Sequence, residues 1–159
     1  MRFFRPQSQL GFTMMELVMV IVLIGILSAV VLPRFAGRLE FEGRGFFNQT
    51  EGMIRYAQKT AIAQRRNVSV QINNTSRMIC LTYQAASLDC SVDGVPEPGS
   101  ALTFSKTAPT DVNFNTTTTL TFTALGRLTG NANVQISVTQ TGAPDAGSIT
   151  VEAVTGYVH

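Results

Sequence analysis

The sequence predicts an α+β protein in which a long N-terminal helical region precedes a domain of short antiparallel strands. An uncharged apolar block covers residues 17–32, and a helical hydrophobic period follows over residues 46–66. After Asn67 the period changes to that of β-strands. We therefore divide the chain into four parts: a leader (1–11), a transmembrane helix (12–33), an amphipathic helix (34–66) and a β domain (67–159).

The leader carries the whole positive excess of the chain. The net charge is +2, and Arg2 and Arg5 account for it, because the remaining residues contain ten basic and ten acidic side chains. The positive-inside rule then predicts a cytoplasmic N-terminus and a β domain on the other side of the inner membrane, in the periplasm. A charge of this size does not by itself indicate a nucleic-acid partner.

The apolar block has the length of a membrane span. Residues 12–32 contain one ionisable side chain, Glu16, and a helix of this length spans about 30 Å. A secretory signal is shorter and ends at small residues, whereas this block ends at Pro33. We expect Pro33 to kink or end the helix and Gly25 to be a second weak point. Further glycines predict irregularity within residues 33–46.

The second helical stretch is amphipathic. At 100° per residue, an apolar face collects Phe47, Ile54, Ala57 and Ala61. The opposite face collects Arg55, Lys59 and Arg66. Two interpretations of this basic face remain open. We favour a solvated surface over a contact stripe for an acidic partner.

Alternating apolar residues predict about six strands after Asn67. A hairpin is expected from residues 68–72 and 78–83 around the polar turn 73–76. Loops are expected at 93–100 and 142–147 because glycine and proline concentrate there. The remaining strand signals are Leu102 with Phe104, residues 120–124, residues 134–138, and residues 149–151 with Val154. The threonine run 116–119 favours an exposed strand edge.

Chemistry-bearing residues are few. Cys80 and Cys90 favour a disulfide over two free thiols in an exported domain, and the bond would stabilise the fold by roughly 3 kcal/mol. The single histidine, His159, makes a zinc enzyme implausible on ligand number. No nucleophile stands beside a base, and no glycine-rich phosphate loop follows a strand. We expect no enzyme activity, no metal and no cofactor.

The N-terminal stretch Gly11-Phe12-Thr13-Met14-Met15-Glu16-Leu17, followed by the apolar helix and Pro33, resembles the type IV prepilin signature. The resemblance implies cleavage between Gly11 and Phe12 by prepilin peptidase and N-methylation of Phe12. In a filament core, Glu16 of one subunit would then neutralise the Phe12 amine of its neighbour and set the axial register. The alternative places Glu16 unpaired at the membrane interface.

Three later stretches, residues 55–68, 120–127 and 149–156, resemble pseudopilin H and related minor pilins. Residues 41–66 also resemble a minor pilin of mannose-sensitive-haemagglutinin-type pili. These resemblances imply a pilin-like fold, with the long helix packed on antiparallel sheets. They imply a structural subunit of a type IV pilus or a type II secretion filament. The implied partners are other pilin or pseudopilin subunits, the prepilin peptidase/methylase and the inner membrane.

Two other functions remain open. Some relatives of this subfamily bind DNA through basic residues near the C-terminus, but here no arginine follows Arg127 and the tail is Gly156-Tyr157-Val158-His159. DNA is therefore a possible partner that we do not favour, with Arg55, Lys59 and Arg66 as its remaining candidate face. A single-pass membrane protein with an unrelated periplasmic role is the third hypothesis, and an uncleaved Gly11 would favour it.

Overall fold

The computed structural model describes residues 12–87, 89–142 and 144–159, and it describes no side chains within residues 29–40. The leader, with the expected cleavage residue Gly11, lies outside the described residues. The chain divides into two compact units, Met1–Gly37 and Arg38–His159, and each is described by itself.

One helix, α1, runs from Met14 to Gln64. Thr13 caps its first turn, since its hydroxyl accepts from the Glu16 backbone N–H at 3.3 Å. The backbone is helical throughout residues 33–46, so the predicted irregularity there is wrong, as is an end of the helix at Pro33. A proline removes one amide donor, and a helix with many turns on both sides can continue through that loss. A kink at Pro33 stays a prediction.

No helix within the described residues is both long and apolar enough to cross a membrane. The expected transmembrane helix, residues 12–33, extends into residues 29–33, whose side chains lie outside the description.

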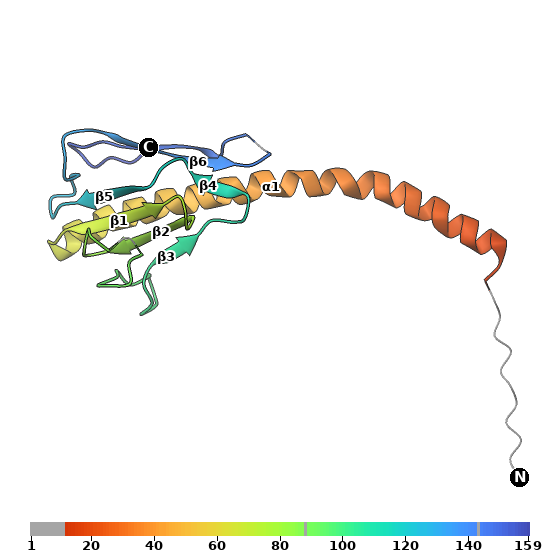
Figure 1. Cartoon of the computed structure of the whole chain (residues 1–159), viewed down its shortest axis with the longest axis horizontal. Coiled ribbons are helices and arrows are strands. Elements are labelled where there is room, and N and C mark those ends of the chain that lie inside the picture. Colours follow the sequence, from red (N-terminus) through yellow and green to blue (C-terminus); the bar gives the residue numbers. More distant parts are fainter. Residues whose placement is uncertain (1–11, 88, 143) are drawn as a thin grey trace, which may run out of the picture. The chain divides into compact units, whose positions relative to one another are not determined.

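Seven strands in two antiparallel sheets make up the rest of the described chain (Figure 1). The first sheet has the order β3-β2-β1-β5 and the second has the order β4-β6-β7. The strands of the first sheet are β1 (Val68–Asn73), β2 (Met78–Thr82), β3 (Ser105–Thr107) and β5 (Thr118–Phe122). Those of the second are β4 (Val112–Phe114), β6 (Val134–Gln140) and β7 (Gly147–Val151).

The strand pairing confirms most of the sequence predictions. The expected hairpin forms, with Val70 opposite Leu81, and β5 lies at a sheet edge with two of the run's threonines, Thr118 and Thr119. Three details differ. β3 begins at Ser105 instead of Leu102, the three-residue β4 was not predicted, and Val154 lies beyond β7. Strands as short as β4 hold too few alternations for a period to show.

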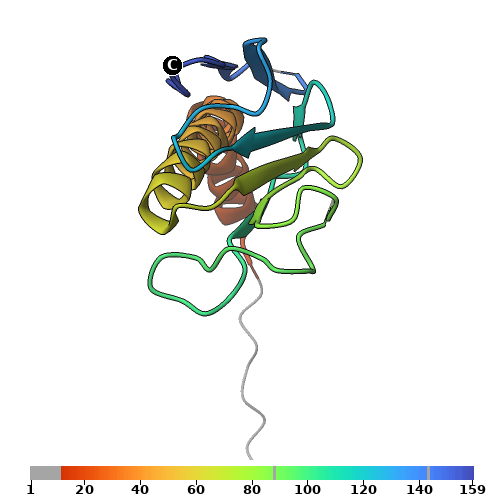
Figure 2. The same ribbon diagram turned by 90° about the vertical axis from the view of Figure 1, so that its left-hand side faces the viewer.

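The C-terminal part of α1 packs on the two sheets, beside β1 and β5 in the end-on view (Figure 2). The predicted apolar face is confirmed: Ile54, Ala57 and Ala61 are fully buried, and Phe47 is partly buried against the same core. Phe46 joins the helix to the second sheet, with its ring 5.5 Å from that of Phe114. The α+β, pilin-like fold class is confirmed, with a long helix on antiparallel sheets.

Candidate functional site

The N-terminal part of α1 is an apolar surface that its own unit does not cover. Ile21 and Leu27 are 60% and 61% exposed, and Gly25 has no neighbouring atom within 4 Å of an added Cβ. The other exposed apolar side chains of this stretch are Phe12, Met14, Met15, Leu17, Val18, Met19, Val20, Val22, Leu23, Ile24 and Ile26. A patch of this size marks a surface made for lipid or for other protein.

Glu16 is the one acid in this surface, and it lies in the first turn of α1. Among the described residues, its carboxylate has no hydrogen bond and no ion pair. Its backbone is held by the Thr13 cap. A carboxylate within an apolar helix therefore needs a partner from outside the described chain.

The predicted basic face is not a continuous set of free cations. Arg55 pairs with Glu51 at 2.8 Å and also donates to the Val158 carbonyl at 3.2 Å. Lys59 is exposed and, within the described part of the chain, makes no such contact. These contacts favour the solvated interpretation for Arg55.

Arg66 lies beyond the end of α1 and bridges to the loop that follows β2. Its guanidinium carbon lies 3.5 Å from the centre of the Tyr83 ring, and its NH2 lies 3.4 Å from the Asp93 carboxylate. A guanidinium stacked on tyrosine and paired with an acid has little left for phosphate. The contacts of Arg55 and Arg66 thus give no support to DNA as the partner.

Two motif stretches far apart in the sequence meet on α1. Gln58 Nε2 donates to the Gly126 carbonyl at 3.0 Å and to the Thr155 carbonyl at 3.2 Å. Gly126 and Gly156 have positive φ values of 77° and 68°, and a Cβ on Gly156 would collide with the Gly126 backbone. Sequence reasoning missed Gln58, because nothing local to residue 58 indicates contacts about 70 and 100 residues away.

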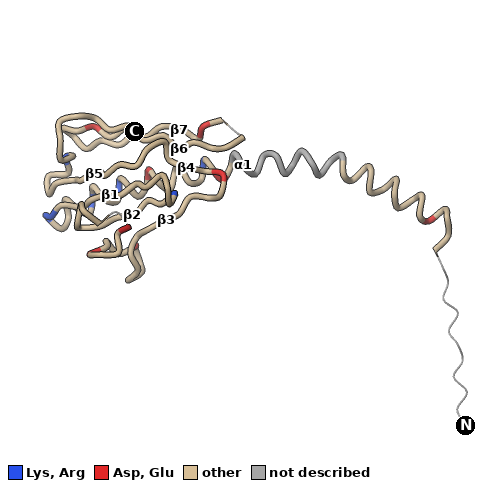
Figure 3. Tube along the Cα trace, viewed as in Figure 1, with Lys and Arg blue, Asp and Glu red and all other residues tan. Residues whose placement is uncertain are grey.

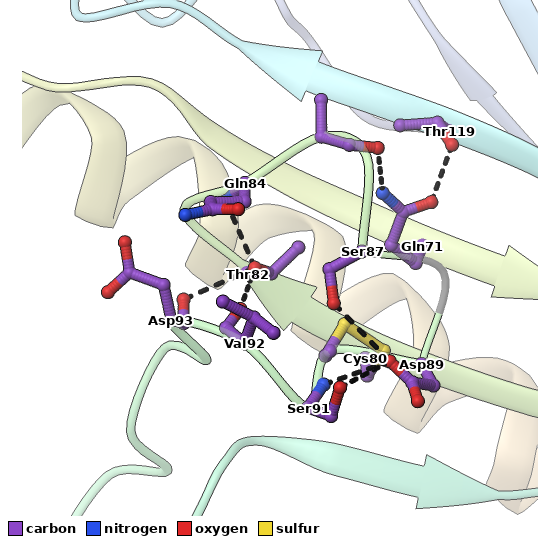
Figure 4. The surroundings of a disulfide bond; sticks show 12 residues. Gln71, Cys80, Thr82, Gln84, Ser87, Asp89, Ser91, Val92, Asp93 and Thr119 are labelled. Carbon is purple, nitrogen blue, oxygen red and sulfur yellow. Dashed lines mark hydrogen bonds between the residues drawn. A yellow bond between two sulfur atoms is a disulfide. The ribbon is translucent and has the colours of Figure 1, made fainter.

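The predicted disulfide is present between Cys80 and Cys90, with 6.1 Å between their Cα atoms (Figure 4). Cys90 has a positive φ of 55°. On one side of it, Asp89 Oδ1 accepts from the Ser91 N–H and hydroxyl at 3.1 and 2.8 Å, and from the Ser87 hydroxyl at 3.3 Å. These hydrogen bonds, led by that of the Ser91 N–H, lower the pKa of Asp89.

The segment closed by this disulfide covers the face of the first sheet that points away from α1. Gln71 is buried there and donates to the Ala85 carbonyl at 2.7 Å (Figure 4). Beside the segment lies an open groove of about 610 Å³, lined largely by hydroxyl and amide groups from Asn73 to Ser91. No group of three or more acidic, histidine or cysteine side chains that could hold a metal occurs in the described part of the chain.

Two family models match the chain. The model described as type II transport protein GspH matches residues 47–155, from the packed part of α1 to beyond β7. The model described as the prokaryotic N-terminal methylation motif matches residues 6–32. A comparison with curated proteins found no match.

Solved structures of similar fold are minor filament subunits. The type IV minor pilin FimU of Pseudomonas aeruginosa (strain PAO1) is 16% identical with a TM-score of 0.51, over 78% of this chain and 88% of that chain. The minor pseudopilin EpsH from the type II secretion system of Vibrio cholerae is 10% identical with a TM-score of 0.56, over 76% of this chain and 96% of that chain. At these identities the likeness shows the fold alone.

The GspH model covers more than half of the chain, and the methylation motif covers the exposed apolar helix with Glu16. The two matches together span both compact units. The chain belongs to the type II transport protein GspH family and is a minor pilin or pseudopilin subunit of the class that prepilin peptidase processes.

Proposed function

We propose that this chain is cleaved between Gly11 and Phe12, N-methylated at Phe12, and assembled from the inner membrane into a type IV pilus or type II secretion filament. One observation carries the proposal. The apolar surface of residues 12–27 is exposed, whereas the Arg38–His159 unit has its own closed core. The first surface needs an apolar environment that the second unit does not supply.

Before assembly, the membrane provides that environment. The apolar helix of residues 12–33 then acts as the anchor, with the leader in the cytoplasm and the β domain in the periplasm. After assembly, the helices of neighbouring subunits replace lipid around it. The open position at Gly25 suits close approach between helices, because small residues let backbones pack tightly.

Glu16 supplies the specificity of this exchange. Cleavage leaves a positively charged amine on Phe12, and methylation keeps that charge. In a core of packed helices, an unpaired carboxylate or amine is strongly unfavourable. Pairing of Glu16 with the Phe12 amine of a neighbouring subunit therefore fixes one axial register out of many.

The first experiment measures the intact mass and N-terminal sequence of the protein from its native membrane, in cells with and without prepilin peptidase. We expect a methylated chain that starts at Phe12 only where the peptidase is present. A chain that starts at Met1 in both strains would make the apolar helix a permanent anchor and would contradict the proposal.

The second experiment tests Glu16 by Glu16→Ala, with Glu51→Gln as a matched helical control outside the apolar stretch. We expect Glu16→Ala to reach the membrane but to fall at least about tenfold in the sheared filament fraction, because a buried charge pair that loses one partner is costly. Glu51→Gln should assemble normally. Normal incorporation of Glu16→Ala would exclude the charge-pair role.

A further inference from the structure

The charged side chains that lack ion pairs are divided between the two ends of the Arg38–His159 unit (Figure 3). We define the distal face, at the end of α1, as Lys59, Ile62, Arg65, Leu125 and Arg127. We define the proximal face, where α1 enters the unit, as Phe41, Glu42, Asp111 and Asp145. Each face combines exposed apolar and charged side chains, and the charges of the two faces are opposite.

The turn after β5 builds the distal face against the last turns of α1. A Cβ on Gly126 would lie 2.7 Å from Ile62 Cδ1, and the Gly126 carbonyl accepts from Gln58. This contact places Leu125 and Arg127, the neighbours of Gly126, beside the helix. Leu125 is 78% exposed and Ile62 is 48% exposed, so the face has an apolar centre.

The cations of the distal face are not neutralised within the unit. In the described structure, the side chains of Lys59, Arg65 and Arg127 make no ion pair and no hydrogen bond, in contrast to Arg55 and Arg66. The face is therefore apolar at its centre and positive around it.

Contacts at the other end of the unit assemble the proximal face. The Asp111 carbonyl accepts from the Thr141 N–H at 2.8 Å, and Asp145 lines a small cavity of about 150 Å³ together with Arg44 of α1. Phe41 is 78% exposed. Among the described side chains, the carboxylates of Glu42, Asp111 and Asp145 have no ion pair. With Arg44 the one described cation near them, the end is net negative.

The two faces are too far apart to attract each other within one molecule. Residues 43 and 62 mark the two ends on α1, and nineteen residues of helix at about 1.5 Å each separate them by about 28 Å. Screening in physiological salt reduces charge interactions beyond about 8 Å. The complementarity acts only when the distal end of one subunit meets the proximal end of another.

We propose that the distal face is a docking site for the proximal face of a second copy of this chain. The contact sets Ile62 and Leu125 against Phe41 and opposes three cations to three carboxylates. Because the two faces differ, the contact is heterologous and extends into a line or helix of subunits instead of closing into a dimer. This inference rests on the proposed assembly of the chain into a filament.

A nucleic acid is the other candidate occupant of a positive face. Phosphate contacts need cations, but they make no use of the apolar centre at Ile62 and Leu125. None of the five side chains that define the distal face is aromatic, so the face offers no ring on which a base could stack. The combination of apolar centre and positive rim matches the proximal face instead.

The test uses the full-length chain in its native membrane. One copy carries a photo-cross-linking amino acid in place of Leu125 and one affinity tag, and a second copy carries a different tag. We expect a cross-linked product with both tags, joined to a peptide that contains Phe41, Asp111 or Asp145. No product, a product joined elsewhere, or a nuclease-sensitive product would overturn the inference.

Charge reversal sharpens the test. Arg127→Glu should lower the yield by about two- to fivefold, as expected for one exposed charge pair, and Asp111→Arg in the second copy should restore it. Arg127→Lys keeps the charge and is the matched control. Raising the salt to 1 M shortens screening to about 3 Å and should also lower the wild-type yield. Yields insensitive to both changes would overturn the inference.

Two further readouts separate the possible failures. Resistance of the Cys80–Cys90 disulfide to alkylation reports that Arg127→Glu is folded, and Lys59→Glu replaces it if it is not. Processing at Phe12 is measured in the same samples. Normal processing without the cross-link contradicts this inference alone, whereas an unprocessed chain contradicts the proposed function.

Discussion

The two parts of α1 both carry many apolar side chains, but these side chains have opposite surroundings. In the first part Ile21 is 60% exposed, whereas in the second part Ile54 is fully buried. The second part has polar residues on one side and apolar residues on the other, so one face suffices for the core of its own domain. The first part is apolar all round, and no single domain face could cover it. The first part serves assembly and the second part serves folding.

The largest expected effect breaks this comparison at its two isoleucines. Ile54→Ala should lower the free energy of unfolding by about 2–5 kcal/mol, because it leaves a cavity in the core. Ile21→Ala should change it by less than about 0.5 kcal/mol, since its side chain leaves no intramolecular contact behind. Urea unfolding of the full chain in mild detergent, followed by tyrosine fluorescence, measures both. Equal losses would show that the N-terminal part also belongs to the folded core.

Loss of the disulfide should have the next largest effect, and it concerns only the β domain. Replacing both Cys80 and Cys90 by serine should lower the unfolding free energy by about 3 kcal/mol, because the unfolded chain regains the freedom of the closed loop. The same urea experiment on the wild type, with and without reductant, provides the comparison. A wild-type midpoint that does not change with reductant would argue against this contribution.

Gln58 tests the attachment of the C-terminal strands to the packed part of α1. Gln58→Ala removes two hydrogen bonds and should cost about 1–2 kcal/mol. Gln49→Ala, an exposed glutamine on the same helix, is the matched control and should cost less than about 0.5 kcal/mol. Hydrogen exchange at residues 149–158 should rise in the first variant only. A uniform rise in both would remove the special role of Gln58.

The smallest expected effect concerns pH. The Asp89 hydrogen bonds hold its folded pKa below the ordinary value of 3.8, so its contribution to stability is present above that value and is lost as the pH falls through the folded pKa. Asp89→Asn should therefore be less stable than the wild type at neutral pH, and the difference should shrink at acid pH. Ser91→Ala should reproduce part of the change. A difference that stays constant with pH would contradict this assignment.

Periodicity alone predicted much of the fold, because burial of one face imposes a period on the sequence. The apolar face at Ile54, Ala57 and Ala61 and the hairpin at Val70 and Leu81 follow from that rule. The proline rule failed at Pro33, where the helix continues. The rule describes a local cost, and the hydrogen bonds of the turns on both sides outweigh it. Strand β4 escaped prediction because three residues carry almost no periodic signal.

The candidate sites divide in the same way. The prepilin-like stretch with Glu16 is contiguous, so the sequence by itself determined that surface and its chemistry. Which of the basic residues are free was decided only by the tertiary structure. Arg55 and Arg66 gain partners from Glu51 and Asp93, and Arg127 joins Lys59 at the end of α1 because Gly126 packs against Ile62. A helical wheel records the angle of a side chain, whereas its charge balance depends on residues that only folding brings beside it.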